Sequence, residues 1–292
     1  MLIDKETMLV LKFGGTSVGS VENMITVKHI INDKTKKVVV LSAMSGTSNA
    51  LIEISEYIEQ KSLKKALQSI AALKITYNET IQQLFSNTTL KAEAKVYIEN
   101  IFAKLEVLVN AAHNLVVHNT IVAQGELLST YIFSRFLQQE GLKTELLPAL
   151  EFMRTDRNNE PDNFYIKQSL NRLFNDLPEA DIYITQGFIA LDAEGDISNL
   201  NRGGSDYTAT IIGAVLEAKE VQIWTDIDGF HNNDPRFVNN TKAISNLSFD
   251  EAAELAYFGA KILHPQTVMP VRALDIPVRL KNTMAPDAYG TL

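Results

Sequence analysis

The residues best suited to chemistry lie at positions 200–209, in the run Leu-Asn-Arg-Gly-Gly-Ser-Asp-Tyr-Thr-Ala. The adjacent glycines let the backbone approach a ligand without interference from a Cβ atom. Arg202 offers a planar fork that fits a carboxylate or a phosphate, and Ser205 and Asp206 add a hydroxyl and a carboxylate. Because the following residues can continue as a helix, the run predicts an anion site at a helix N-terminus. A surface loop with a helix cap is the alternative interpretation of this segment alone.

A second polar segment follows the first apolar run of the chain and reads Lys12-Phe-Gly-Gly-Thr-Ser17. A permissive glycine turn, two hydroxyls and one ammonium suit a phosphate group. The lysine precedes the glycines, so the segment is not a Walker loop, in which the lysine follows them. The alternative is that Lys12 is a solvated residue at the end of a strand.

Further polar clusters follow other apolar stretches. Residues 42–49 carry four hydroxyls and an asparagine before an expected helix, which is more than capping alone requires. Residues 124–126 are expected to open a helix, which would place Glu126 in a first turn favoured by the helix dipole. Asp226 follows a fourth apolar run, and residues 258–265 follow a helix expected over 250–257.

The elements that must position these clusters can be read from the apolar pattern. Short apolar runs at 8–11, 38–41, 182–185 and 221–224 are typical of strands buried on both faces of a parallel sheet. Residues 47–124 contain neither glycine nor proline and carry apolar residues at helical spacing, which predicts several amphipathic helices. Alternating strands and helices predict a right-handed parallel α/β sheet, with ligands beyond the carboxyl ends of its strands.

Composition limits the classes of function. A chain of 292 residues, 46% hydrophobic and 21% charged, fits one large α/β domain or two lobes of a soluble protein. A net charge of −8 without a basic run argues against nucleic-acid binding. The absence of cysteine excludes disulfides and thiol chemistry. No apolar run reaches membrane-spanning length and the N-terminus lacks a signal-peptide core, so we expect a cytoplasmic protein without a membrane partner.

Six segments, in order between Leu11 and Leu292, resemble the catalytic domain of aspartokinases in the amino-acid kinase family. Each is modest alone, but together they cover nearly the whole chain. They are Lys12-Phe-Gly-Gly-Thr-Ser-Val-Gly19, Gly125-Glu126-x-x-Ser129, Thr185-Gln-Gly-Phe188, Arg202-Gly-Gly-Ser-Asp-Tyr-Thr-Ala209, Trp224-Thr-Asp226 with Asp234-Pro-Arg236, and Phe258-Gly-Ala-Lys-Ile-Leu-His-Pro265.

The resemblance implies an open αβα sandwich with a mainly parallel central sheet. It implies one catalytic domain over 1–292, with an aspartate-binding lobe over about 1–200, a helical region at about 49–140 within it, and an ATP-binding lobe over about 201–292. The implied reaction is ATP-dependent phosphorylation of the L-aspartate β-carboxylate to 4-phospho-L-aspartate, the first step toward lysine, threonine and methionine. Mg²⁺ would be carried by the ATP phosphates without a direct protein ligand, and a homodimer is a further expectation.

The resemblance also implies roles for individual residues. Lys12 would bridge the β- and γ-phosphates, and Asp206 would orient Lys12 and the metal-bound phosphates. Glu126 would bind the substrate ammonium, and Arg202 would hold a substrate carboxylate. The other implied ATP contacts are Gly14, Gly15, Ser17, Thr225, Asp226, His231, Arg236, Lys261 and Ile262, and the other implied aspartate contacts are Ser45, Thr47, Ser48 and Ser205.

Three residues depart from the pattern of the family. Asn201 stands where relatives usually have glycine, and asparagine tolerates left-handed geometry best among the other residues. Met44 replaces a substrate-contacting serine of some relatives, and His231 replaces a nucleotide-contacting tyrosine. Each departure removes or alters one expected contact.

Several alternatives stay open at this point. No regulatory ACT domain is expected in the sequence, which fits part of a longer chain, the front of a bifunctional aspartokinase–homoserine dehydrogenase, or an enzyme without ACT domains. A glutamate 5-kinase or a uridylate kinase would share the fold, although the segments starting at Arg202 and Phe258 argue against both. A catalytically silent binding subunit is the alternative from another class, and the retained polar residues argue against it.

Overall fold

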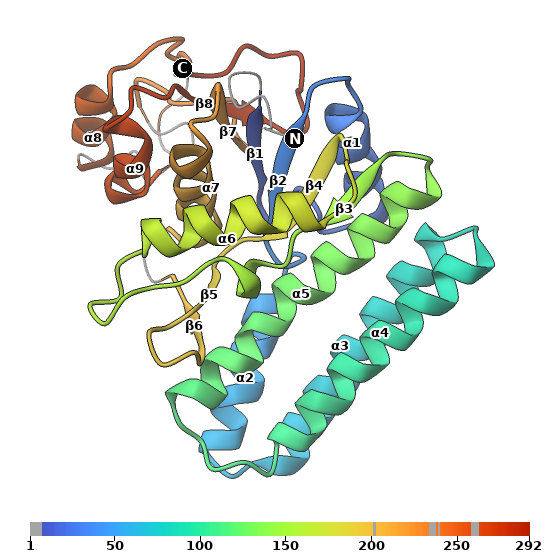
Figure 1. Cartoon of the computed structure of the whole chain (residues 1–292). Helices are drawn as coiled ribbons and strands as arrows, with labels where there is room; N and C mark the ends of the chain where they lie inside the picture. Colours follow the sequence, from blue (N-terminus) through green and yellow to red (C-terminus); the bar gives the residue numbers. More distant parts are fainter. Residues whose placement is uncertain (1–7, 201–202, 234–237, 239, 258–262) are drawn as a thin grey trace.

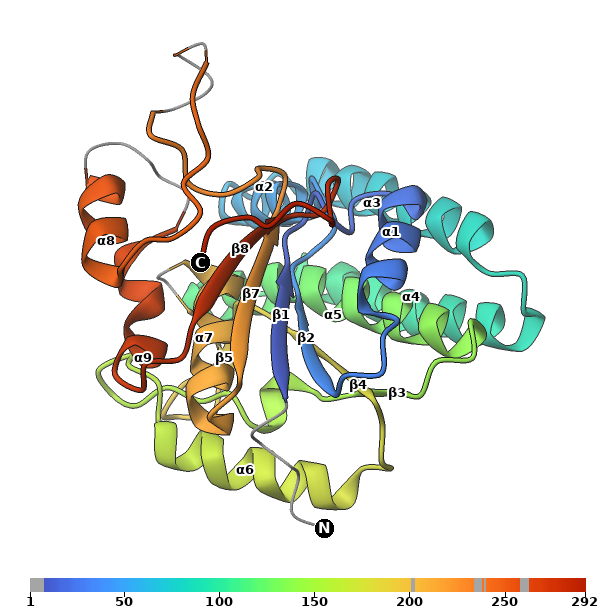
Figure 2. The same ribbon diagram turned by 90° about the horizontal axis from the view of Figure 1, so that it is seen from above.

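The structure of the protein is a computed structural model that describes residues 8–200, 203–233, 238, 240–257 and 263–292. Its centre is a twisted parallel sheet, seen from above in Figure 2. Six strands of the described residues are hydrogen-bonded in the order β3-β4-β2-β1-β7-β8, and every neighbouring pair is parallel. The strands are β1 (Leu9–Phe13), β2 (Lys37–Leu41), β3 (Thr144–Leu146), β4 (Ile182–Gln186), β7 (Glu220–Thr225) and β8 (Val278–Asn282).

The strands predicted from the four apolar runs are confirmed as β1, β2, β4 and β7. Parallel neighbours require crossover connections, which helices supply here. The helices are α1 (Val21–Ile31), α2 (Thr47–Glu59), α3 (Leu63–Leu84), α4 (Thr88–Leu108), α5 (Leu115–Gln139), α6 (Asn163–Asp176), α7 (Gly204–Leu216), α8 (Phe249–Tyr257) and α9 (Met269–Arg272), with short 3₁₀ turns η2 (Ala149–Glu151) and η3 (Pro265–Val268).

Both faces of the sheet are covered by helices, as Figure 1 shows. Successive side chains of a strand point to opposite faces. On β1, Leu11 and Phe13 belong to an apolar core shared with α1 to α5, whereas Val10 belongs to a second core shared with α6, α7 and α9. The predicted αβα sandwich with a parallel sheet is therefore confirmed. Lys12 alternates with Leu11 and Phe13, so its side chain lies on the α7 face.

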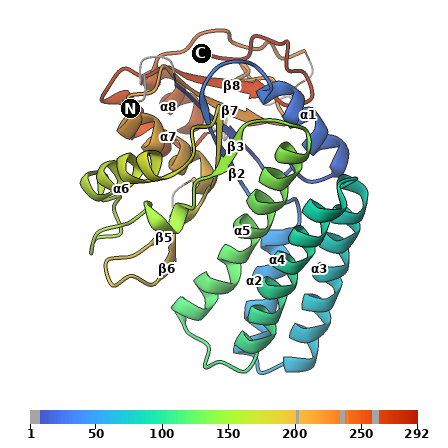
Figure 3. The ribbon, with the colours of Figure 1, turned by 45° about the vertical axis from the view of Figure 1, so that its right-hand side comes forward.

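Helices α2 to α5 form a bundle that extends away from the sheet (Figures 1 and 3). Asn87 caps α4 by accepting hydrogen bonds from the backbone N–H groups of Thr89 and Leu90, each at 3.0 Å. A separate antiparallel hairpin, β5 (Ile189–Leu191) and β6 (Ile197–Asn199), contacts α5 through β6. Among the described residues, no helix is both long enough and apolar enough to cross a membrane.

Candidate active site

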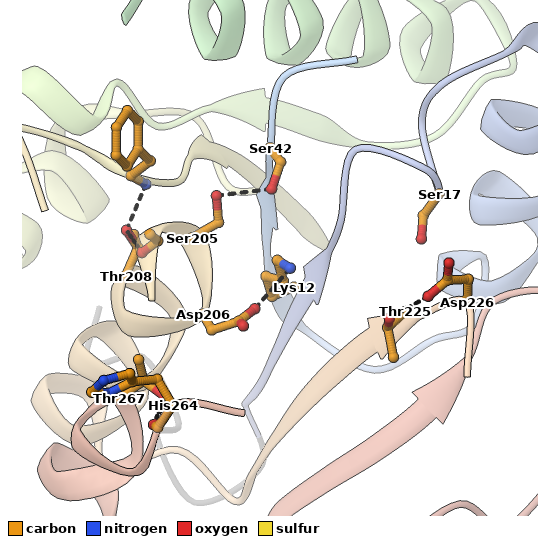
Figure 4. Close-up of polar contacts among 12 residues, drawn as sticks. Lys12, Ser17, Ser42, Ser205, Asp206, Thr208, Thr225, Asp226, His264 and Thr267 are labelled. Atoms are coloured by element: carbon orange, nitrogen blue, oxygen red, sulfur yellow. Dashed lines mark hydrogen bonds and ion pairs between the residues drawn. The ribbon is translucent and has the colours of Figure 1, made fainter. Parts of the chain in front are cut away.

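Lys12 and Asp206 form an ion pair beside the carboxyl edge of the sheet, as Figure 4 shows. The Nζ atom of Lys12 is 2.7 Å from Oδ1 of Asp206. Lys12 is paired in the sheet between Val40 of β2 and Ile223 of β7, and Asp206 lies in the first turn of α7, where the helix dipole favours an acid. The two side chains are 12% and 20% exposed, so a ligand can still reach both charges.

The turn after β1 lies against the loop that follows β2. The N–H of Ser45 donates to the carbonyl of Gly15 at 3.1 Å. A Cβ atom on Gly15 would lie only 2.8 Å from the carbonyl oxygen of Ala43, and one on Gly14 would lie 3.5 Å from Nζ of Lys12. The missing side chains therefore let the two loops meet and keep backbone close to the lysine ammonium, which suits a phosphate site.

The start of α7 is tied to the end of β2. Gly203 is the N-cap residue and has a φ of +67°, in the left-handed region that favours glycine. Ser42 donates a hydrogen bond from its hydroxyl to the hydroxyl oxygen of Ser205 at 2.8 Å (Figure 4). Helix α7 begins at Gly204, the second glycine of the pair, so the helix predicted at this segment is confirmed. The polar segments after β1, after β2 and at the start of α7 thus converge at one edge of the sheet.

Glu126 lies in the interior of α5, so the prediction of a helix start at 124–126 is wrong. The helix begins at Leu115, where the side chain of Asn114 accepts a hydrogen bond from the backbone and acts as the cap. Gly125 has a packing reason to lie inside the helix, because a Cβ atom there would come 2.8 Å from Cβ of Ala43. That close approach brings α5, and Glu126 with it, against the loop after β2.

The Glu126 carboxylate is buried, with 4% of the residue exposed. Its Oε1 accepts a hydrogen bond from the N–H of Ala43 at 3.2 Å. Its Oε2 is also buried and has no hydrogen-bond partner within the described part of the chain. Burial raises the pKa of Glu126 to about 7, and the bond from Ala43 opposes that rise. A cationic ligand group would satisfy the free oxygen and favour the ionised form.

Three candidate aspartate contacts lie at the start of α2, next to the loop that binds Glu126. Thr47 is buried, Ser48 is half-buried and Ser45 is exposed. Met44 is buried in the core shared with the helical bundle, so it supplies packing at this point in place of a hydroxyl.

The candidate nucleotide contacts at the other side of the edge are partly engaged within the protein. Ser17 is buried and shares a hydrogen bond of 2.7 Å with the hydroxyl of Thr283. Thr225 donates to Oδ1 of Asp226 at 3.0 Å, and the Asp226 side chain lies in an exposed segment directly after β7 (Figure 4).

His231 has hydrogen bonds on both ring nitrogens. Its Nε2 is 2.7 Å from Oδ1 of Asp228 and its Nδ1 is 2.8 Å from the hydroxyl of Thr241. The hydrogen bond from His231 holds the pKa of Asp228 below its usual range. The remaining predicted site residues lie outside the described residues: they are Arg202, Arg236, Lys261 and Ile262, together with the departure at Asn201.

Sequence reasoning did not single out Ser42 or Tyr77 as site residues. Ser42 was one hydroxyl among several, and only the fold brings it to Ser205. Tyr77 sits within a helical apolar pattern that predicts a core residue. Its hydroxyl nevertheless lies 3.0 Å from Oγ1 of Thr47. No local signal could have found that pair, because its members are 30 positions apart.

Replacing Gly125 with alanine is expected to destabilise the protein. The new Cβ would lie 2.8 Å from Cβ of Ala43 and 3.3 Å from side-chain atoms of Leu51 and Thr47. Overpacking of this kind costs about 1–3 kcal/mol, against a helix-propensity gain of about 1 kcal/mol. Denaturant unfolding would measure the difference. An increase in stability equal to the propensity gain would mean that the loop after β2 moves aside freely.

The chain was compared with protein families and with curated relatives. Residues 7–282 match the amino acid kinase family. The lysine-sensitive aspartokinase 3 of Escherichia coli (strain K12) is 36% identical over 290 residues, which make up 98% of this chain and 64% of that protein. The chloroplastic aspartokinase 1 of Arabidopsis thaliana is 35% identical over 300 residues, which make up 99% of this chain and 52% of that protein. The chain therefore spans between half and two thirds of the length of these relatives.

Solved structures agree with this likeness. Escherichia coli aspartokinase III in complex with lysine and aspartate has a TM-score of 0.86 and 34% identity, over 98% of this chain and 64% of that one. The same enzyme in complex with aspartate and ADP has a TM-score of 0.84 and 34% identity, over 97% of this chain and 64% of that one. The resemblance to aspartokinases expected from the six segments is thus confirmed. With its parallel sheet, its strand-end lysine and this family match, the chain belongs to the amino acid kinase family.

Proposed function

We propose that the chain transfers the γ-phosphoryl group of ATP to the β-carboxylate of L-aspartate, forming 4-phospho-L-aspartate. The relatives named aspartokinase support this proposal, and one of them has been solved with aspartate and ADP. The observation that carries it is the buried Oε2 of Glu126, which has no hydrogen-bond partner among the described residues, next to the loop after β2 that the other oxygen of Glu126 contacts. The ionised form of such a buried carboxylate is stabilised by a cation, which the α-ammonium group of an amino acid supplies.

Lys12 and Glu126 have different roles in the proposed reaction. Lys12 stabilises the negative charge that spreads over the transferred phosphoryl group, and Asp206 keeps the Lys12 ammonium in place. Glu126 anchors the ammonium of aspartate, and Arg202 is assigned to one of its carboxylates. The attacking β-carboxylate is already ionised at neutral pH, so no general base is needed.

We assign Mg²⁺ to the phosphates of ATP. The residues present fit this assignment, because Mg²⁺ keeps several waters and binds substrate phosphates, so a nearby acid can act through those waters. Asp206 is the acid beside Lys12, and its 20% exposure leaves it accessible to phosphate-bound metal. The ion supplies charge neutralisation when bound. The glycine turn after β1 and the assigned contacts after β7, Thr225 and Asp226, hold the nucleotide.

ADP release, coupled to an indicator reaction, should depend on L-aspartate in the presence of Mg²⁺ and ATP. L-glutamate and UMP serve as the alternative acceptors, since they are the substrates of the two kinases of the same fold named above. We expect kcat/KM to be highest for aspartate. A higher value for glutamate or UMP would contradict the assignment, and nucleotide binding without turnover of any acceptor would favour a silent binding subunit. The homodimer and the cytoplasmic location stay predictions from the sequence.

A further inference from the structure

The hydroxyl of Tyr77 is a polar group in an otherwise apolar contact between helices. The side chain extends from α3, is completely buried, and packs its ring edge-on against Phe102 of α4 with the centroids 6.1 Å apart. A phenylalanine would fill the same space without a polar atom to satisfy. The hydroxyl lies 3.0 Å from Oγ1 of Thr47, the first residue of α2 and a candidate aspartate contact.

Thr47 is fixed on both branches of its side chain. Its Cγ2 lies against α5, where a Cβ atom on Gly125 would be only 3.3 Å away. Its hydroxyl meets Tyr77 of α3, and the residue as a whole is 2% exposed. A β-branched side chain has few favourable χ1 rotamers, and the contacts on both branches of Thr47 select one of them. The same α5 turn carries Glu126, so the two candidate aspartate contacts share one support.

We propose that Tyr77 is a positioning residue of the aspartate site and acts by donating its hydroxyl proton to Oγ1 of Thr47. This inference rests on the proposed function. With its oxygen occupied as an acceptor, Thr47 keeps its own proton for a ligand oxygen, such as a carboxylate oxygen of aspartate. A hydroxyl aligned before binding loses less freedom when the substrate arrives.

The surroundings keep the hydroxyl of Tyr77 protonated, which is the form that can donate. Burial raises the pKa of Tyr77 above its usual value, the hydrogen bond with Thr47 opposes that rise, and the negative charge of Glu126 adds to it. The phenol therefore carries its proton throughout the working range of pH.

The Tyr77→Phe variant tests the proposal, because it removes the hydroxyl and keeps the ring. We expect the aspartate KM to rise about 2- to 10-fold, as for the loss of one neutral hydrogen bond, with the ATP KM and kcat unchanged within about twofold. Tyr183→Phe is the matched control. Tyr183 is 3% exposed, packs edge-on against Phe174, and accepts a hydrogen bond from the N–H of Ala180 at 3.2 Å, outside the aspartate site. The control should lower thermal stability without changing the aspartate KM.

A double-mutant cycle with Thr47→Val then separates positioning from packing. In the Thr47→Val background, Tyr77→Phe should have no further effect on the aspartate KM, because the hydroxyl it acts through is already absent. Additive effects would overturn the proposal. So would an unchanged aspartate KM in Tyr77→Phe with a stability loss like that of Tyr183→Phe. These results leave the proposed function intact, whereas a wild-type protein that releases no ADP with aspartate overturns both.

Discussion

Replacing Lys12 with alanine is expected to lower kcat for aspartate phosphorylation by about 10²–10³-fold, the usual loss for one preorganised charge-stabilising group. The ammonium of Lys12 lies 2.7 Å from Asp206 at the edge where the polar loops converge. Phosphoryl transfer relies mainly on positioning and charge neutralisation, so the loss of this ammonium should act on the chemical step. Steady-state kinetics with saturating ATP and aspartate would measure the loss.

The removal of Lys12 also leaves the Asp206 carboxylate without its counter-charge, next to an anionic ligand. Part of the effect would then be repulsion, and the double variant Lys12→Ala with Asp206→Asn separates the two contributions. Lys36→Ala is a suitable control, because Lys36 pairs with Glu179 at 2.6 Å on an exposed surface. It should leave kcat unchanged, as exposed ion pairs contribute little. A Lys12→Ala enzyme with normal kcat would remove Lys12 from the catalytic machinery.

The central sheet could be predicted because its strands are buried on both faces. Val38, Val39 and Val40 are completely buried, and such continuous apolar runs are distinctive in sequence. The position of the site followed from the same rule, since parallel strands bring their carboxyl ends to one edge. The local sequence predicts Lys12 at a strand end and Asp206 at a helix N-terminus, and the family resemblance links the two. The structure pairs them.

The start of α5 could not be predicted in this way. The sequence predicts a helix start at 124–126, yet α5 continues through Gly125, whose missing side chain has a steric reason that only the fold supplies. The contact between Tyr77 and Thr47 could not be predicted for a related reason. A tyrosine within an apolar helical pattern predicts burial, but the partner of its hydroxyl is set by the tertiary structure.

Replacing Glu126 with glutamine is expected to reduce kcat/KM for aspartate by about 30-fold or more, since losing one member of a desolvated charge pair costs about 2–5 kcal/mol. Glutamine keeps the shape of the side chain and an oxygen for the N–H of Ala43. In the wild type, kcat/KM for aspartate should also fall as the pH drops through about 7, because burial raises the pKa of Glu126 to that value and the protonated acid does not pair with ammonium. The Glu126→Gln variant should lose this acidic limb of the pH profile.

The same substitution should have the opposite effect on stability, and this contrast makes the test sharp. The pKa of Glu126 is raised by folding, so the folded state holds the proton more tightly than the unfolded state and stability is lost as the pH rises toward about 7. Each pH unit between the unfolded and the folded pKa changes the free energy of unfolding by about 1.4 kcal/mol. The wild type should therefore lose about 2 kcal/mol of unfolding free energy between about pH 5.5 and pH 8, relative to Glu126→Gln. Denaturant unfolding at the two pH values would measure it. If the variant binds aspartate normally and shows no relative gain at pH 8, Glu126 is a neutral packing residue and the ammonium of the substrate is held elsewhere.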